Sequence, residues 1–287
     1  MPLEVICAGV ATMDTIATVE RPPGPDERVV ADPFVRAGGG PAATAAVTLA
    51  RLGIPVGFCG VVGADQDGER IRADLESAGV DTRWLLTRES VPTPQSMILV
   101  SPGSRSIITT PSIPPDPQRI PIDRSAWLHV DQAGYPAVAG RAASAQLSID
   151  GGNAIPGLDL AGTGLYAPTV QTLRRTFPGP TIEASLRAAA AAGAQRVVAT
   201  DGAEGAYLLQ DGEYVHVPAY SIEPVSTMGA GDVFHGALLA GLVAGFGLTD
   251  AVRRAAAAAA LSCRALDGRS GIPDTQEIDN FLHSGVA

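Results

Sequence analysis

Short apolar runs alternate with stretches of helical periodicity along most of the chain. The runs predict buried strands at residues 5–10, 56–62, 127–130, 146–150 and 196–200. Between them, apolar side chains recur every three to four residues, most clearly in the helix expected just after Pro41. This alternation predicts an α/β fold with a mainly parallel central sheet that helices cover on both faces.

Two regions depart from this pattern and resemble antiparallel hairpins. Residues 16–20 and 28–35 flank one proline- and glycine-rich turn, and residues 96–100 and 106–110 flank another. We expect a small β-sheet lid, formed by inserted segments of about 15–36 and 95–111, on a single domain spanning residues 1–287. Because an exposed sheet edge favours pairing with another strand, a homodimer through the lid is expected.

Composition narrows the class of protein. Hydrophobic residues make up 46% of the 287 positions and charged residues 17%, which is enough to bury a large core. The formal charge of -10 disfavours nucleic acids and anionic membranes as partners. No apolar run has the length of about 18 residues that a membrane span needs. The three cysteines lack the spacing of a metal site or disulfide framework, so a reducing, cytoplasmic location is expected.

The chain contains no lysine, and all its 20 basic residues are arginines. Several nucleotide and carbonyl chemistries depend on a lysine. The absence excludes a GxxxxGK phosphate loop, a Schiff-base lysine and the strand lysine of protein kinases.

The most informative segment is residues 226–236, where a Gly-Ala-Gly turn opens directly into an apolar helix. The first N–H groups of a helix have no partner within it, and the helix dipole adds positive charge there, so such a turn attracts phosphate. Asp232 falls in the first turn, where it can accept a proton from a substrate hydroxyl. The alternative is that Asp232 caps the helix and the glycines only permit the turn. We interpret His235, on the same helix face, as a packed, hydrogen-bonded histidine.

This segment resembles the second signature of the PfkB/ribokinase family of carbohydrate kinases, D-T-x-G-A-G-D-x-F. Every position matches except the first, where Ser226 replaces aspartate. The resemblance implies that Asp232 is the catalytic base. It also implies that the amides of Gly229, Ala230 and Gly231 form an anion hole.

Residues 37–46 look like the family's first signature, in which the backbone approaches the sugar. The resemblance implies substrate binding at Gly39 and Gly40, with Thr44 standing where asparagine is common. The same segment fits the dinucleotide pattern G-x-G-x-x-A. We favour the sugar site because the segment follows a lid-like strand and not the first core strand.

The resemblance extends over essentially the whole chain. The residues of its motifs are most similar to those of sulfofructose-kinase-like and ketohexokinase-like members of the family. It implies that Asp14 binds sugar hydroxyls. The turn at 200–206 corresponds to the nucleotide side, and residues 261–273 to the adenine-side loop. The cofactor-binding candidates are therefore Thr200, Gly202, Gly205, Cys263 and Gly268.

Two departures from the family pattern affect the anion sites. The N-x-x-E motif is missing around residues 165–170, so no metal ligand is assigned and Mg²⁺ must rest on the ATP phosphates and water. A requirement for a monovalent cation stays open. No arginine stands near residues 131–134 to bind an anionic sugar substituent. Arg105, in the lid hairpin, is the remaining basic candidate for substrate anions.

The expected function is an ATP-dependent sugar kinase, which transfers the γ-phosphoryl group to a hydroxyl of a small sugar or sugar derivative. A nucleoside kinase of the adenosine type is the alternative enzyme, although no aromatic clamp for a base stands beside Asp14. A non-catalytic sugar or nucleotide sensor is the alternative outside catalysis.

Overall fold

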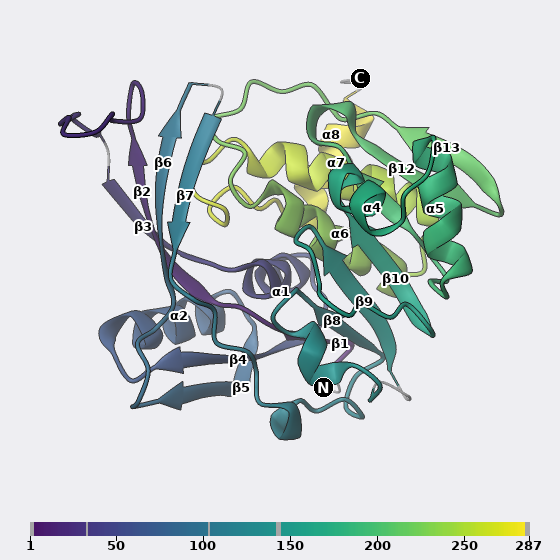
Figure 1. Cartoon of the computed structure of the whole chain (residues 1–287), viewed down its shortest axis with the longest axis horizontal. Helices are drawn as coiled ribbons and strands as arrows, with labels where there is room; N and C mark the ends of the chain where they lie inside the picture. Colours follow the sequence, from purple (N-terminus) through teal and green to yellow (C-terminus); the bar gives the residue numbers. More distant parts are fainter. Residues whose placement is uncertain (1–2, 33, 103, 142–144, 285–287) are drawn as a thin grey trace.

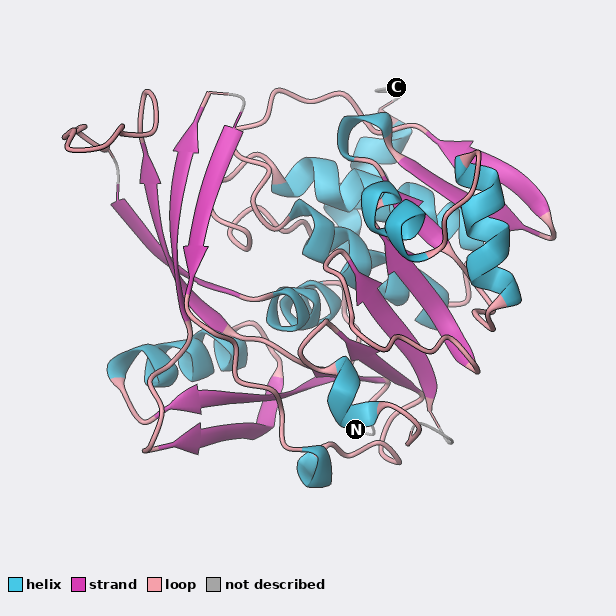
Figure 2. Cartoon of the chain, in the orientation of Figure 1, coloured by secondary structure: helices cyan, strands magenta, loops and turns pink. Residues whose placement is uncertain are grey.

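The centre of the molecule is a sheet of six parallel strands in the order β10-β9-β8-β1-β4-β5 (Figure 1 and Figure 2). The structure is a computed structural model that describes residues 3–32, 34–102, 104–141 and 145–284. Alternate side chains enter the two cores, so Val5 packs on one face and Ile6 on the other. The strands are β1 (Val5–Ala8), β4 (Val56–Gly63), β5 (Asp81–Arg88), β8 (Trp127–Val130), β9 (Gln146–Gly151) and β10 (Thr163–Pro168).

Helices cover both faces of this sheet, which confirms the α/β fold that the hydrophobic pattern predicts. One core packs under α1 (Pro41–Arg51), α2 (Gln66–Ser77), α6 (Ala230–Val243), α7 (Leu248–Ser262) and α8 (Thr275–His283). The other packs under α3 (Tyr135–Val138), α4 (Val170–Thr176) and α5 (Ile182–Ala191). Short 3-10 turns are η1 (Pro117–Arg119) and η2 (Gly202–Glu204).

Three antiparallel strands continue the fold beyond β10. They are β11 (Val198–Thr200), β12 (Ala206–Gln210) and β13 (Glu213–Val217). Parallel bridges from Tyr166 to Val197 and from Thr169 to Thr200 join this sheet to the edge of the central one. The Thr200 turn is therefore held in line with the carboxyl ends of the central strands.

A separate four-stranded sheet, here called the lid sheet, stands beside the carboxyl ends of the central strands (Figure 1). Its order is β3-β2-β6-β7, with β2 and β6 parallel and the outer pairs antiparallel. Its strands are β2 (Thr12–Thr18), β3 (Phe34–Gly39), β6 (Gln95–Ser101) and β7 (Ser104–Thr109).

Strand boundaries differ from the sequence prediction in the lid sheet. The strand expected at 28–35 runs instead from Phe34 to Gly39, in register with β2 from Ala17 to Thr12. Residues 28–32 form no strand, and Val30 is 87% exposed because no neighbouring strand covers it. The β-branched Val29 and Val30 favour a strand, but such residues form one only where they can pack against a neighbouring strand. The prediction from propensity therefore placed the start of this strand too early.

Two central strands, β5 and β10, were not predicted. β5 alternates apolar residues with arginines and threonines, and β10 contains both Gly164 and Pro168. Neither sequence has the continuous apolar run typical of a buried parallel strand.

Asp131 ties together the strand ends that border the site. It follows β8, is fully buried, and its carboxylate accepts the N–H groups of Val10 at 2.7 Å, Ala42 at 3.3 Å and Gly134 at 2.9 Å. The end of β1 and the start of α1 are therefore fixed to one side chain. No helix within the described ranges is long and apolar enough to cross a membrane.

Candidate active site

The first turn of α6 leaves main-chain N–H groups free of side-chain partners. Gly229 precedes the helix in the left-handed region with φ 69°, and no side chain caps the turn. Its neighbour is backbone, because a side chain on Gly229 would place Cβ 2.7 Å from the Cα of Gly268. Gly231 is exposed and Asp232 is half-buried in the same turn. The turn combines donors for an anion with a carboxylate beside them.

The Asp232 carboxyl lies in a field that favours its protonated form. Burial, followed by the neighbouring Asp150 charge, raises the pKa of Asp232 to about 7, and Asp131 adds to the effect. His235 and Arg269 act in the opposite direction. A carboxyl with a near-neutral pKa suits general-base chemistry, because it is substantially ionised yet basic enough to accept a proton.

His235 forms a buried ion pair directly behind Asp232. Its Nδ1 lies 2.9 Å from Oδ2 of Asp150, and both side chains are only 5% exposed. Burial alone would lower the pKa of His235, but the Asp150 charge raises it above its usual value. Burial would likewise raise the pKa of Asp150, yet His235 lowers it. The packed histidine expected from the sequence thus has a carboxylate partner from β9.

A second buried histidine, His129, lies beside the pair of His235 and Asp150 and is neutral. His129 lies on β8, with its Nδ1 at 3.0 Å from the hydroxyl of Ser148. Its ring centre is 6.4 Å from that of His235. Burial lowers the pKa of His129 to about 4, and the nearby His235 charge acts in the same direction. The cluster therefore places a neutral imidazole, His129, beside one whose cationic form the Asp150 charge favours.

The sugar-side residues come together where the lid sheet meets α1. Asp14, on β2, is buried and accepts the hydroxyl of Thr12 at 2.8 Å. Burial raises its pKa, while hydrogen bonds from Thr12 and Ser96 lower it. A side chain on Gly39 would place Cβ 2.0 Å from Oδ2 of Asp14, and one on Gly40 (φ 93°) would meet the carbonyl of Val10 at 2.4 Å. Glycine is therefore required at both positions, because Asp14 packs against Gly39 and the main chain of Val10 against Gly40.

Arg105 reaches from the lid sheet to the loop before α6. Its Nη1 donates to the hydroxyl of Thr227 at 2.7 Å. Apolar contacts join the same parts of the molecule, since Ile16 and Ile98 of the lid sheet pack with Met228. Arg105 thus lies next to the anion-binding turn, and Asp14 lies on another strand of the lid sheet.

The nucleotide-side candidates fall into two groups. Gly268 contacts Gly229, and the carbonyl of Cys263 accepts the N–H groups of Val225 at 2.8 Å and Ser226 at 3.2 Å, so this loop supports the turn before α6. Thr200, Gly202 and Gly205 lie on the separate turn between β11 and β12. There, φ of 97° and a close approach to the carbonyl of Val217 require glycine at 205.

Three charged residues of this region were not assigned a role from the sequence. Asp131 and Asp150 stand at or beyond the carboxyl ends of parallel strands, which is where ligands bind in open α/β sheets. That position was a usable signal, because both strands were predicted. Arg269 gave no such signal, since its burial depends on Gly38 and Gly39, far away in sequence.

The described residues contain no group of three or more His, Cys, Asp or Glu side chains arranged to hold a metal ion. Asp150, the carboxylate beside Asp232, is already engaged by His235 and by the N–H of Gly152 at 2.7 Å. The protein part of the site therefore fits Mg²⁺ only as a nucleotide complex, in which phosphates and water supply most ligands.

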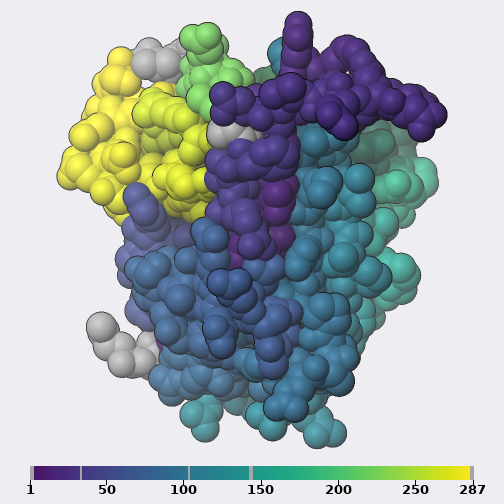
Figure 3. Space-filling model, turned by 90° about the vertical axis from the view of Figure 1, so that its left-hand side faces the viewer, coloured from purple at the N-terminus to yellow at the C-terminus, as the bar shows by residue number. Residues whose placement is uncertain are grey.

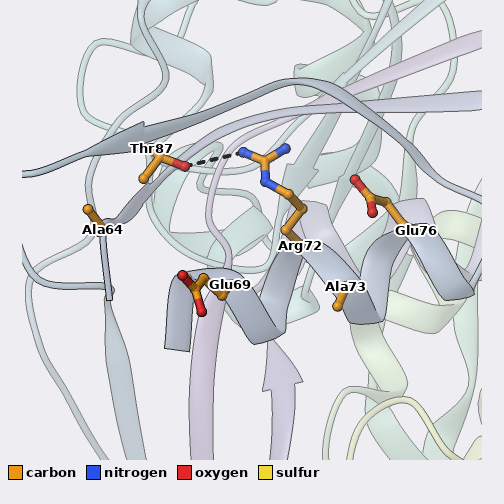
Figure 4. Close-up of a pocket in the computed structure, with 8 residues that line it drawn as sticks. Ala64, Glu69, Arg72, Ala73, Glu76 and Thr87 are labelled. Carbon is orange, nitrogen blue, oxygen red and sulfur yellow. Dashed lines mark hydrogen bonds between the residues drawn. The ribbon is translucent and has the colours of Figure 1, made fainter. Parts of the chain in front are cut away.

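A cavity of about 320 Å³ lies elsewhere, between α2 and β5 (Figure 4). Arg72 crosses it and donates to Thr87 at 3.3 Å and to the carbonyl of Leu85 at 2.6 Å. Glu69 and Glu76 line the same cavity. None of the residues expected at the active site borders it.

The chemistry assembled at the start of α6 is that of a phosphotransferase with an alcohol acceptor. Main-chain N–H groups at a helix start without a side-chain cap can hold phosphoryl oxygens, and a carboxylate of near-neutral pKa can take the proton of a hydroxyl. Phosphoryl transfer needs little more from a protein than positioning and charge stabilisation.

Comparison with known proteins identifies the family. The model of the "pfkB family carbohydrate kinase" matches residues 3–155 and 168–275. The chain therefore belongs to the PfkB family of carbohydrate kinases, as its two signatures indicate.

Individual relatives span nearly the whole chain. A ribokinase of Bacillus subtilis is 26% identical over 301 residues, covering 96% of this chain and 99% of the relative. An ATP-dependent ribose-1-phosphate kinase of Halopiger xanaduensis is 30% identical over 297 residues, covering 98% of each. The structure of a putative ribokinase II from E. coli in complex with ATP and Mg²⁺ has a TM-score of 0.84 at 22% identity, covering 98% of this chain and 99% of that one. The likeness to this solved structure shows a ribokinase fold.

Replacing His235 by asparagine should destabilise the protein by about 3–5 kcal/mol, because it leaves the Asp150 charge buried without its partner. The raised pKa of His235 contributes stability below its unfolded value of 6.5, and the lowered pKa of Asp150 contributes stability above its unfolded value of 3.8. The difference from wild type should therefore be largest between these two pH values. Denaturant unfolding at several pH values measures it. The exposed His283→Asn is the control, and an equal, small effect of both variants would contradict the ion pair.

Proposed function

We propose that the chain transfers the γ-phosphoryl group of ATP to a hydroxyl of a small sugar or sugar derivative, with Asp232 as the general base. The observation that carries this proposal is the position of Asp232 in an uncapped helix turn, beside the amides of Gly229, Ala230 and Gly231. Its raised pKa, about 7, supports the same role.

In the proposed step, the sugar hydroxyl oxygen forms a bond to the γ-phosphorus while the bond from that phosphorus to the bridging oxygen of ADP breaks. Asp232 accepts the hydroxyl proton, and ADP leaves with the electron pair of the broken bond. The amides at 229–231 would hold the charge on the transferred oxygens, and the fixed helix dipole would need no reorganisation to do so.

The sugar would bind between the lid sheet and the start of α1. Asp14 would accept hydrogen bonds from sugar hydroxyls, and Gly39 and Gly40 would let the Asp14 carboxylate and the end of β1 lie close to the turn that borders the sugar. Arg105 would hold the lid sheet near the phosphoryl group through Thr227. A closed lid excludes water, which would otherwise compete with the sugar as phosphoryl acceptor.

The nucleotide would lie on the opposite side, along Thr200, Gly202 and Gly205 and the loop of Cys263 and Gly268. ATP is the phosphoryl donor in the name of the Halopiger relative, and ATP with Mg²⁺ is bound in the E. coli structure. Mg²⁺, when bound with ATP, supplies charge neutralisation between the phosphates.

The named relatives suggest which acceptors to try. One is a ribokinase and another acts on ribose-1-phosphate, so free pentoses and pentose phosphates come first in a panel that also holds ketoses, acidic sugars and nucleosides. ADP release with a nucleoside alone would support the nucleoside kinase alternative. Tight binding of sugar and nucleotide without ADP release would support a sensor.

A homodimer through the lid sheet is part of the proposal. Phe34, Met97 and Ile108 share the outer face of this sheet, because Met97 pairs with Ile108 and lies level with Arg36, two positions from Phe34. All three are more than half exposed. Figure 3 views the molecule from this side. Apolar side chains gathered on one sheet face are typical of an interface.

Asp232→Asn should lower kcat by about 10²- to 10⁴-fold, because the variant keeps the shape of the site but loses the proton acceptor. ATP affinity should change little, since the amides and the helix dipole remain. Initial rates of ADP release and calorimetric binding of ATP measure the two quantities. The matched control is Asp250→Asn, which also changes a first-turn aspartate, on α7. Near-normal turnover of Asp232→Asn would refute the general base.

The value of kcat/KM for the sugar should rise with pH through about 7, because Asp232 accepts a proton only in its ionised form. Below that pH the rate should fall about tenfold per pH unit. A pH–rate profile at saturating ATP measures this limb. The residual activity of Asp232→Asn should lack it, and a flat wild-type profile between pH 5.5 and 8 would contradict the assignment.

Light scattering at micromolar concentration should give twice the chain mass of 29.2 kDa. Phe34→Asp should shift the mass to that of one chain, because it places a charge in the apolar face. Phe246→Asp, at another exposed phenylalanine, should not. A wild-type monomer would exclude the lid dimer.

A further inference from the structure

Arg269 links the two halves of the candidate site. Its Nη2 donates to the carbonyl of Gly39 at 2.7 Å, and its Nε donates to the hydroxyl of Thr44 at 3.2 Å. The first bond holds the end of lid strand β3, and the second holds the first turn of α1. Both acceptors belong to the sugar side, although Arg269 itself follows the loop of Cys263 and Gly268.

The remaining end of the guanidinium is packed against Gly38. A side chain there would place Cβ 2.4 Å from Nη1, which is buried and has no hydrogen-bond partner among the described residues. Gly38 therefore makes room for the arginine. Seen from the lid side, the yellow C-terminal segments lie against the purple lid segments (Figure 3).

The loop that carries Arg269 is fixed to the anion-binding turn. Asp267 accepts the N–H groups of Arg269 at 2.8 Å and Ser270 at 2.7 Å, which orders the loop. Gly268, which lies between Asp267 and Arg269, contacts Gly229 through backbone atoms alone. A displacement of the turn before α6 must therefore move the base of Arg269.

The charges of four carboxylates act on the buried guanidinium. Burial lowers the pKa of Arg269 to about 10, while Asp14, Asp74, Asp232 and Asp267 oppose this effect. The side chain remains cationic at neutral pH. Its charge in turn lowers the pKa of Asp14 and of Asp232.

We propose that Arg269 is a positioning residue that couples the anion-binding turn to the sugar-side turn, so that a bound nucleotide orders Gly38, Gly39 and the end of β3 for the sugar. The inference rests on the proposed nucleotide site at Gly268 and Gly229. Asparagine is common in the family at the position of Thr44. In this chain, the hydroxyl of Thr44 accepts a hydrogen bond from Arg269. Two hydrogen bonds and one close contact join segments more than 200 residues apart in sequence.

Amide hydrogen exchange at residues 34–39 tests the coupling without any sugar. In wild type, Mg²⁺ with a non-hydrolysable ATP analogue should slow exchange there by about fivefold or more, which is within the range of allosteric coupling. Arg269→Gln should lose this protection. Arg72→Gln is the matched control, because Arg72 also donates to main-chain carbonyls and threonine hydroxyls but lies at the cavity beside α2. It should keep the protection.

Two further variants separate tethering from charge and from folding. Arg269→Lys keeps the positive charge but loses the guanidinium, which makes both hydrogen bonds. It should therefore lose the exchange protection but keep the wild-type rise of kcat/KM with pH. Arg269→Gln should instead shift the rise of kcat/KM to higher pH, because the charge that lowers the pKa of Asp232 is gone. Gly38→Ala should displace the guanidinium with every charge retained, and should also lose the protection.

Unchanged protection in Arg269→Gln, or its absence in wild type, would overturn the inference. A wild-type chain that phosphorylates no member of the sugar panel would instead refute the proposed function, while the exchange measurement would still decide the role of Arg269.

Discussion

The contact between Gly229 and Gly268 is the constraint on which the site depends. Gly229 is in the left-handed region, and the space of its absent side chain is filled by the backbone of Gly268. No side chain caps this turn, and the N–H of Ala230 makes only a long contact, 3.4 Å, to the carbonyl of Thr227. The position of the proposed anion site is thus set by the packing of two backbone segments and not by side-chain rotamers.

Charge is balanced around this turn. Asp131 is satisfied by main-chain N–H groups, Asp150 by His235, and Asp14 lies near Arg269. Within the described part of the chain, Asp232 makes no hydrogen bond or ion pair of this kind, and burial together with the Asp150 charge raises its pKa to about 7. Burial also raises the pKa of Asp131, to about 6, but its main-chain hydrogen bonds act in the opposite direction, and the pKa of Asp232 rises further. Strained electrostatics of this kind cluster at functional sites.

The lid sheet connects the proposed sugar site to these charges. Asp14 belongs to its strand β2, Arg105 reaches from β7 to Thr227, and Arg269 holds the end of β3. A movement of the lid sheet would change contacts on both sides of the reacting groups. This is the physical basis for expecting that sugar and nucleotide affect each other's binding.

Much of this fold follows from local patterns in the sequence. Continuous apolar runs correctly predicted four strands of the central sheet, β1, β4, β8 and β9. The fifth run, 196–200, was expected in the same core but forms β11 of the three-stranded antiparallel sheet. β5 and β10 lack such runs because arginines interrupt one and glycine and proline the other. The Gly-Ala-Gly turn and Asp232 were also predicted, since their geometry is local to one helix start. The Asp150–His235 pair and the position of Arg269 could not be, because they arise from contacts between segments about 85 and 230 residues apart.

The account's central claim is that Asp232 and the amides of residues 229–231 converge where a terminal phosphate meets an alcohol. A crystal structure with ADP, aluminium fluoride and the sugar of highest turnover tests it most directly. The account predicts the fluoride group within hydrogen-bond distance of these amides and a sugar hydroxyl within about 3 Å of the Asp232 carboxylate. A fluoride group bound away from the start of α6, or an Asp232 side chain that contacts no hydroxyl, would contradict it.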